Sequence, residues 1–500
     1  MSEALYKLRQ HIGEIADLKS AASILEWDQE TYMPDGASEV RATQVATLRK
    51  LAHQQFSSDE TAQWLDEATA QLQNVHEDSD DVRMLKVWRK DFERAKKLPS
   101  SLVFAKNQAS GRAKEAWKQA RATSNFAVFA PHLEALLEHS RAEAAAIGYE
   151  KDPYDALLDA FEPGLKTADV TRVFHQLRED LVPIVQTIGA AEQPDDAFLF
   201  APYDEQKQWD FGMAVLADFG YDFNCGRQDR SAHPFTTTFA TTDVRITTRL
   251  MPDFLPSALY GTLHECGHAL YEQGIDPKWN RTLLNEGTSL GMHESQSRLW
   301  ENQVGRSHAF WQHYYARLQA IFPETLGKVD LARFYRALNK VQPSLIRVEA
   351  DEVTYPLHIM LRFELETALI KQEIAVADLP EIWRNKMQDY LGVVPQNDGE
   401  GVLQDIHWSL GAFGYFPTYA LGTLISSQLY EAAERTLPDL SAQFSRGEFL
   451  PLREWLRQEV HQFGRKYTAN EILEKICGSG LDAAPWIRYI KAKYAPLYGF

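Results

Sequence analysis

The chain has 500 residues, 44% of them hydrophobic and 24% charged, which is enough to bury a large core in one domain or several. Its formal net charge of -18, from 70 acidic and 52 basic residues, argues against a nucleic-acid partner, because phosphates would meet a repelling field. The same charge mildly disfavours binding to anionic membrane surfaces.

The N-terminal residues carry no basic stretch followed by an apolar segment, and no window of about 18 uninterrupted apolar residues occurs anywhere. The three cysteines, Cys225, Cys266 and Cys477, form no C-x-x-C pair and are too few for a disulfide framework. We therefore expect a soluble, cytoplasmic protein with no membrane partner.

The N-terminal third shows helical periodicity. Between residues 85 and 95, apolar side chains recur three or four positions apart among Lys and Arg, as on one face of an amphipathic helix. Proline and glycine interrupt the pattern at residues 33–36, 98–100 and 162–164, where we expect helices to end. None of these breaks resembles an interdomain linker, so we expect one domain over residues 1–500.

Residues 236–250 differ from the rest of the chain. They are rich in β-branched side chains and alternate in polarity toward their end, which predicts a strand or a hairpin. Helical periodicity returns at Pro256 and continues to about Gln273, and Gly274 is predicted to end this helix in the left-handed conformation.

This predicted helix contains the sequence HECGH, from His264 to His268. Side chains four residues apart lie about 40° apart around a helix, so both imidazoles can point at one cation. Glu265 is rotated by about 100° and can accept a proton from a water molecule whose pKa the metal lowers toward about 7. The pattern predicts a metal-dependent hydrolase, although five residues with three fixed positions also arise by chance.

Two acidic residues compete for the third metal ligand. Glu286 precedes a Gly-Thr-Ser break, whereas Glu294 lies inside the next predicted helix, which continues to Gly305, with Ser297 and Arg298 on its face as possible partners. The rigidity of a helix favours Glu294, and Glu286 remains the alternative.

Two neighbours of the predicted ligands have less direct roles. Cys266 projects about 200° away from His264 around the helix, so we interpret it as a buried core thiol. His293 precedes Glu294 and points elsewhere, and we expect it to shape or orient the site.

Five motifs occur in order along the chain: DVRIT at 243–247, HECGH at 264–268, HESQ at 293–296, IRVEAD at 346–351 and GVLQDIHW at 401–408. They resemble the motifs of the carboxypeptidase Taq family of metallocarboxypeptidases. Two further segments, WDQETYMP at 27–34 and GYFPTY at 414–419, also look like family segments. Together they span nearly the whole chain, which makes the resemblance far more specific than HECGH alone.

The resemblance implies a mainly α fold with a deep groove and a small β-sheet beside the metal-binding helix. It implies Glu294 as the third ligand, zinc or sometimes cobalt as the metal, and a homodimer. Its members release single residues from peptides with a free C-terminus, with broad specificity and usually sparing proline.

Recognition of a free carboxylate calls for an arginine, whose planar guanidinium offers two parallel donors. Arg347 and Arg245 are the candidates. Each has an acidic residue close by in sequence, Asp351 and Asp243, so either arginine could instead form a structural salt bridge.

Negative charge that develops on the scissile carbonyl oxygen needs hydrogen-bond donors besides the metal. His407, Tyr415 and Tyr419 could supply them, and the resemblance favours His407 and Tyr419, with Tyr415 as a substrate contact. Gln404 and its neighbour Asp405 are expected to orient the nearby histidine or to bind the substrate backbone.

Two other interpretations remain. One is an endo-acting or dipeptide-releasing oligopeptidase on the same helical scaffold. The other is a helical binding protein that keeps a metal site without turnover, because a fold does not guarantee a function.

Overall fold

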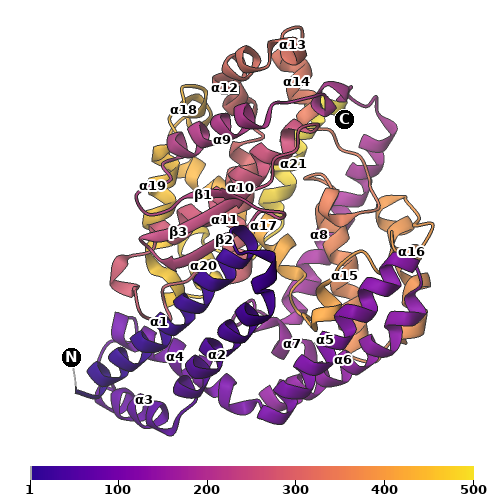
Figure 1. Cartoon of the computed structure of the whole chain (residues 1–500). Coiled ribbons are helices and arrows are strands. Elements are labelled where there is room, and N and C mark those ends of the chain that lie inside the picture. Colours follow the sequence, from indigo (N-terminus) through magenta and orange to yellow (C-terminus); the bar gives the residue numbers. More distant parts are fainter. Residues whose placement is uncertain (1–2) are drawn as a thin grey trace. The chain divides into compact units, whose positions relative to one another are not determined.

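The computed structural model describes residues 3–500 as a mostly helical chain with one small sheet, as predicted (Figure 1). Contacts between residues divide the chain into two compact units. Unit 1 runs up to Lys96 and takes in Asp195–Leu338 and Leu429–Cys477. Unit 2 consists of Lys97–Pro194, Asn339–Gln428 and Gly478–Phe500. The expectation of one catalytic domain over residues 1–500 stays a prediction.

Unit 1 holds most of the helices. Those before the sheet are α1 (Glu3–Thr31), α2 (Ser38–Phe56), α3 (Asp59–Gln71), α4 (Asp80–Lys97) and α9 (Glu205–Phe219). Those after it are α10 (Leu255–Gly274), α11 (Leu290–Arg298), α12 (His308–Ile321), α13 (Pro323–Leu326), α14 (Leu331–Leu338), α18 (Leu440–Ser445), α19 (Leu450–Glu459) and α20 (Ala469–Cys477).

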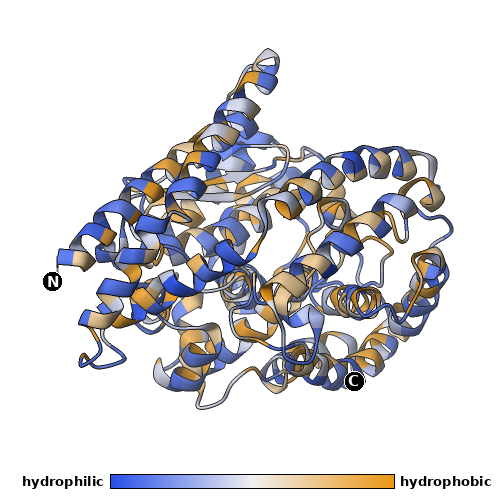
Figure 2. Ribbon diagram, turned by 90° about the horizontal axis from the view of Figure 1, so that it is seen from below, coloured by the Kyte–Doolittle hydropathy of each residue, from blue (hydrophilic) through white to orange (hydrophobic). Residues whose placement is uncertain are grey.

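The predicted helix breaks are confirmed. Pro34 precedes a short 3-10 turn between α1 and α2, Pro99 caps the start of the next helix, and Gly164 takes a positive φ of 88° between two helices. Helix α4 buries Leu85, Trp88 and Phe92 on one face, which the amphipathic pattern predicts. Figure 2 shows the same alternation of hydrophilic and hydrophobic positions along many helices.

The predicted hairpin is confirmed as strands β2 (Thr236–Ala240) and β3 (Asp243–Thr248), which pair antiparallel with Thr237 opposite Arg245. A third strand, β1 (Gln228–Arg230), pairs parallel to β3, so the order is β1-β3-β2 and β2 lies at an edge. The sheet lies beside α10 (Figure 1). Strand β1 was not predicted, because its three residues are too few to show a period-2 pattern.

One detail of the α10 prediction is wrong. Gly274 belongs to the helix and is not in the left-handed conformation, and Ile275 caps the helix with φ -64°. A Cβ atom at position 274 would lie 2.6 Å from Nδ1 of His461. Glycine is therefore needed for the close packing of a distant segment and not for a turn.

The helix predicted to continue to Gly305 changes type on the way. Helix α11 begins after Ser289, whose hydroxyl accepts a hydrogen bond from the main-chain N–H of Met292. It passes at Leu299–Val304 into a π-helix, a wider turn that often marks functional sites because it redirects side chains.

Unit 2 is built almost entirely of helices around its own apolar core. Trp383, Trp408 and Trp486 are among its buried aromatic residues. Its helices are α5 (Ser100–Thr123), α6 (Phe126–Ile147), α7 (Pro153–Leu158), α8 (Thr167–Ala190), α15 (Tyr355–Ile370), α16 (Leu379–Leu391), the first part of α17 (Pro417–Thr436) and α21 (Ala484–Tyr498). Within residues 3–500, no helix combines the length and apolar character that crossing a bilayer requires.

Candidate metal centre and active site

Three side chains of unit 1 converge on one point. The Nε2 atoms of His264 and His268 each lie 3.5 Å from the same oxygen, Oε2 of Glu294. The candidate ligand atoms of the three residues all lie within 4.8 Å of one another. Ligand atoms bound about 2 Å from a tetrahedral zinc stand roughly 3.3 Å apart. Two imidazoles and one carboxylate at this spacing therefore fit a divalent metal.

The close approach of α10 and α11 brings the ligands together, and Gly267 permits it. A Cβ atom at Gly267 would lie 2.4 Å from the carbonyl oxygen of Gln296 and 2.6 Å from Cα of Ser297. Both distances are far below van der Waals contact, so a larger side chain would push the two helices apart.

The two residues expected to support Glu294 do so. Ser297 donates a hydrogen bond of 3.0 Å from Oγ to Oε2, and Arg298 donates one of 2.7 Å from Nε to Oε1. Both oxygens of the carboxylate are therefore held in a fixed orientation, with Oε2 directed toward the two imidazoles.

A carboxylate in the π-helix orients His264. Nδ1 of His264 lies 2.9 Å from Oε2 of Glu301, which leaves Nε2 on the side of Glu294. Arg298 and Arg306 contact the same carboxylate at 3.4 and 3.6 Å. Histidines that bind metals are commonly oriented by an acceptor on their other ring nitrogen, and Glu301 has this position.

His268 is oriented by a different group. Its Nδ1 lies 2.6 Å from Nδ1 of His293, whose Nε2 lies 2.7 Å from Oε1 of the buried Glu272. The expectation that His293 orients the site and does not bind metal agrees with this chain of contacts.

The charges of the cluster suit cation binding. Burial opposes protonation of His264, but the carboxylates of Glu294 and Glu301 outweigh it and raise its pKa to about 9. Burial lowers the pKa of His268 to about 3. Burial works against ionisation of Glu294, yet Arg298 and His264 hold its pKa well below the ordinary value. Metal binding therefore requires His264 to release its proton, while Glu294 is already ionised.

The predicted general base is fixed by the edge strand of the sheet. Oγ1 of Thr236, in β2, donates a hydrogen bond of 2.7 Å to Oε2 of Glu265. The side chain of Glu265 is buried, and burial raises its pKa above the ordinary value. A carboxylate with a raised pKa and one oxygen held by a donor is suited to proton transfer.

Two rival ligands lie away from the metal cluster. The side chain of Glu286 is 62% exposed and lies 3.8 Å from Arg465, so it does not join His264 and His268. Cys266 is fully buried, as expected for a core thiol, and burial raises the pKa of its thiol.

Arg245, on β3, is engaged within unit 1. Its Nε and Nη2 form two bonds of 2.8 Å to the carboxylate oxygens of Asp243. Its guanidinium carbon lies 4.5 Å from the ring centre of Trp27 and 5.0 Å from that of Phe239. This is the salt-bridge geometry considered as the alternative role, and substrate binding by Arg245 stays a prediction.

Arg347 lies in unit 2 and is almost buried, with 5% exposure. Its Nε and Nη2 donate bonds of 3.0 and 2.8 Å to Oδ1 of Asp405, and its Nη1 donates one of 2.9 Å to the hydroxyl of Tyr355. The nearby acid in sequence, Asp351, instead accepts bonds from the main chain of Val353 and Thr354.

The other predicted residues of unit 2 surround this arginine. Nε2 of His407 lies 3.3 Å from the hydroxyl of Tyr419, and the ring of Tyr415 is centred 5.4 Å from that of His407. The guanidinium of Arg347 lies 5.1 Å from the ring centre of Tyr419. Burial lowers the pKa of His407 to about 4, so its ring is neutral at neutral pH.

Gln404 bonds to the main chain. Its Oε1 accepts a bond of 2.8 Å from the N–H of Arg347, and its Nε2 donates one of 3.1 Å to the carbonyl of Leu345. These bonds fix the turn that carries Arg347. The predicted binding of the substrate backbone by Gln404 remains untested.

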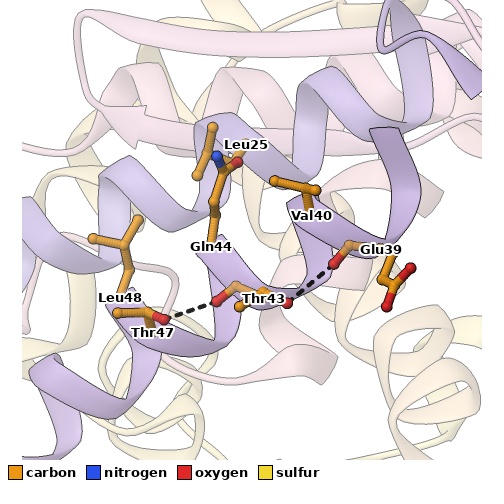
Figure 3. Close-up of a pocket in the computed structure, with 7 residues that line it drawn as sticks. All are labelled: Leu25, Glu39, Val40, Thr43, Gln44, Thr47 and Leu48. Atoms are coloured by element: carbon orange, nitrogen blue, oxygen red, sulfur yellow. Dashed lines mark hydrogen bonds between the residues drawn. The ribbon is translucent and has the colours of Figure 1, made fainter. Parts of the chain in front are cut away.

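A separate hollow of about 650 Å³ lies between α1 and α2 (Figure 3). The hydroxyls of Thr43 and Thr47 donate to carbonyls of the preceding turn, at Glu39 and Thr43. Leu25, Val40 and Leu48 complete a largely apolar lining with one carboxylate and no histidine or cysteine. Its residues do not offer hydrolytic or metal-binding chemistry.

Several residues that contact the predicted site residues could not be predicted from the sequence. Glu301, Glu272 and Thr236 contact the predicted residues from positions that match no motif pattern. The close packing at Gly267 could have been predicted. A glycine inside a helix costs about 1 kcal/mol of stability relative to alanine, so its presence indicates that another element packs closely against it.

Comparisons with known proteins agree with this geometry. The family described as carboxypeptidase Taq (M32) metallopeptidase matches residues 7–494. The chain is 41% identical to thermostable carboxypeptidase 1 of Thermus thermophilus, over 99% of both chains, and 39% identical to carboxypeptidase 1 of Bacillus subtilis, over 97% of both. The crystal structure of an M32 carboxypeptidase from Deinococcus radiodurans is 40% identical, covers 100% of both chains and has a TM-score of 0.97. The chain belongs to the carboxypeptidase Taq (M32) family of metallopeptidases.

Proposed function

We propose that this metallocarboxypeptidase removes single residues from the free C-terminus of peptides by hydrolysis, with Glu265 as the general base. The observation that carries the proposal is the convergence of His264, His268 and Glu294 beside that carboxylate. We further propose broad specificity that spares proline, as the family resemblance implies.

The proposed metal is zinc, with cobalt as an alternative. Two imidazoles and a carboxylate are a donor set typical of catalytic zinc, which supplies Lewis acidity and lowers the pKa of water toward about 7. The protein contributes the orientation of its ligands through Glu301 and His293.

Glu265 accepts a proton from the attacking water and delivers it to the departing amine. Because Thr236 already donates a hydrogen bond to Oε2, we assign the proton transfer to Oε1. His407 and Tyr419 are proposed to donate hydrogen bonds to the carbonyl oxygen as it gains negative charge, and Tyr415 to contact the substrate.

Arg347 is the proposed ligand of the substrate's terminal carboxylate. Its three bonds to Asp405 and Tyr355 leave two of the five N–H groups of a guanidinium as donors. Arg245 is the weaker candidate, because Asp243 occupies its two-pronged edge. A fixed carboxylate anchor makes the terminal peptide bond the one that is cut.

A digestion time course on a mixed peptide, followed by mass spectrometry, tests the reaction. A ladder that shortens from the C-terminus, stops on chelation and is absent in Glu265→Gln with its metal retained is the expected result. Release of internal fragments would refute exo-cleavage and leave the oligopeptidase interpretation.

A C-terminally amidated peptide separates a carboxypeptidase from an endopeptidase directly. An endopeptidase does not need the terminal carboxylate and should still cut the amide. The proposed carboxypeptidase should lose most of its rate on the amide.

The resemblance also leads us to propose a cytoplasmic homodimer. Light scattering that gives the 57.0 kDa of one chain at all concentrations would exclude the dimer.

A further inference from the structure

Two arginines of unit 2 share one aspartate. Oδ1 of Asp405 accepts both bonds from Arg347, and Oδ2 accepts a bond of 2.7 Å from Nε of Arg362 and lies 2.6 Å from its Nη2. Each carboxylate oxygen therefore serves a different arginine. A single Arg–Asp pair is neutral, whereas this trio carries one excess positive charge.

The surrounding titratable groups leave this excess in place. Burial lowers the pKa of His358 well below its ordinary value and that of His407 to about 4, so both rings are neutral. Glu366, one helical turn after Arg362, interacts with it, but burial raises the pKa of Glu366 to about 7. At pH 6 this carboxyl is mostly protonated and adds little negative charge.

The excess charge is accessible at Arg347 and not at Arg362. Arg362 is fully buried, its Nη1 donates a bond of 2.7 Å to the carbonyl of His358, and its guanidinium carbon lies 4.6 Å from the ring centre of Trp383. The side chain of Arg347 keeps 6% exposure and two N–H donors. An incoming anion can therefore meet Arg347 only.

The positive charge of Arg362 affects how well Arg347 can bind a second carboxylate. A carboxylate that binds Arg347 approaches the carboxylate of Asp405 on the same guanidinium, and the two negative charges repel each other in a poorly screened site. A second buried positive charge on the far oxygen of Asp405 offsets that repulsion. Without Arg362, Arg347 alone would have to balance the carboxylates of Asp405 and the substrate.

We propose that Arg362 is a positioning residue for substrate selection: it balances the charge of Asp405, so that Arg347 stays available to a peptide's free C-terminal carboxylate. This inference rests on the proposed role of Arg347 and adds a residue outside every recognised motif. Arg362 acts through Asp405 and does not touch the substrate.

Binding measurements at pH 6 can isolate this role from chemistry. The metal-loaded Glu265→Gln protein, which should not turn over, is titrated calorimetrically with one peptide as its C-terminal acid and as its amide. The ratio of the two Kd values reports the carboxylate alone, because general damage to the fold weakens both ligands equally. Arg362→Met should reduce the preference for the acid by roughly tenfold or more, the range of a charge-assisted hydrogen bond.

The decisive variant is Arg362→Met combined with Asp405→Asn. It removes one positive and one negative charge, which restores the excess of one on Arg347, so the preference for the acid should return to within about threefold of the parent value. Arg178→Met is the matched control, because Arg178 pairs with Glu364 in the same unit and has no contact to Asp405 among those that the described residues show. It should leave the ratio unchanged.

Each outcome decides the inference. If Arg347→Ala abolishes the preference for the acid, two results overturn the role of Arg362 alone. One is an unchanged Kd ratio in Arg362→Met, and the other is a double variant that does not recover the preference. An unchanged ratio in Arg347→Ala overturns the proposed anchor, and the inference falls with it. If Arg362→Met alone does not fold, the double variant decides: a ratio near the parent value supports the inference and a lost preference overturns it.

Discussion

The hydroxyl of Thr236 lies 2.7 Å from Oε2 of Glu265 and donates a hydrogen bond to it. This contact joins the edge strand β2 to the metal-binding helix α10, so the sheet fixes the orientation of the predicted general base. Proton transfer depends on such geometry, because a base must lie within hydrogen-bond reach of the water that it activates.

Thr236→Val should therefore lower kcat by about tenfold with little change in KM, the effect of one hydrogen bond of about 1.4 kcal/mol. The two side chains have nearly the same shape, so packing is kept. Steady-state kinetics on one peptide measures the split, and Thr236→Ser, which keeps the hydroxyl, should recover most of the rate. Equal loss in both variants would contradict the role of the hydrogen bond, because Thr236→Ser keeps the hydroxyl that donates it.

Replacing Glu294 by alanine should remove the metal, because it deletes one of three ligands and leaves two imidazoles that bind far more weakly. Metal content after dialysis, determined by elemental analysis, should fall below about a tenth of the parent value, an estimate in line with losing a ligand. Glu286→Ala is the control, because its side chain is exposed and apart from the cluster. Loss of metal in Glu286→Ala but not in Glu294→Ala would show that Glu286, and not Glu294, is the third ligand.

Gly267→Ala tests the contact between α10 and α11. The added methyl group would meet the main chain of Gln296 and Ser297, and overpacking of this kind costs roughly 1–3 kcal/mol. We expect a lower melting temperature and a metal affinity reduced by about tenfold, since Glu294 moves with α11. Chelator competition measures the affinity. Gly189→Ala, in a helix where a Cβ atom meets nothing within 4 Å, should show neither effect.

The buried carboxyl of Glu366 should make stability depend on pH. It accepts bonds from the side chains of Tyr154 and Trp408 and from the N–H of Gly414, at 2.6, 2.8 and 3.0 Å, yet burial raises its pKa to about 7. The folded protein thus holds a proton that the unfolded chain has lost. Stability from this group is fully present below the ordinary pKa of about 4.5 and falls as the pH rises to 7.

The shift corresponds to a loss on the order of 3 kcal/mol between pH 4.5 and pH 8. Urea unfolding at a series of pH values should show this decline in the parent protein and a flatter profile in Glu366→Gln, which has no proton to exchange. Parallel profiles in the two proteins would mean that the pKa of Glu366 is not raised in the folded state.

Local patterns in the sequence identified the chemistry and much of the architecture. The four-residue spacing of His264 and His268 fixes their relation on any helix, and the β-branched run at 236–250 indicated the hairpin. The choice of Glu294 over Glu286 also followed from a local argument, the rigidity of a helix, and the clustered ligand atoms agree with it. These conclusions depend on neighbours along the chain, which a sequence displays directly.

Contacts between distant residues were decided only by the tertiary structure. Thr236 and Glu265 are 29 positions apart, and Arg347 and Asp405 are 58 apart, so no periodicity links them. Gly274 shows the same limit. The helix ends there as predicted, but glycine is needed because of the nearby ring of His461 and not for a left-handed turn. Spacing along a helix or strand follows from covalent geometry, whereas the pairing of buried charges depends on which elements pack together, and packing joins parts of the chain that the sequence keeps apart.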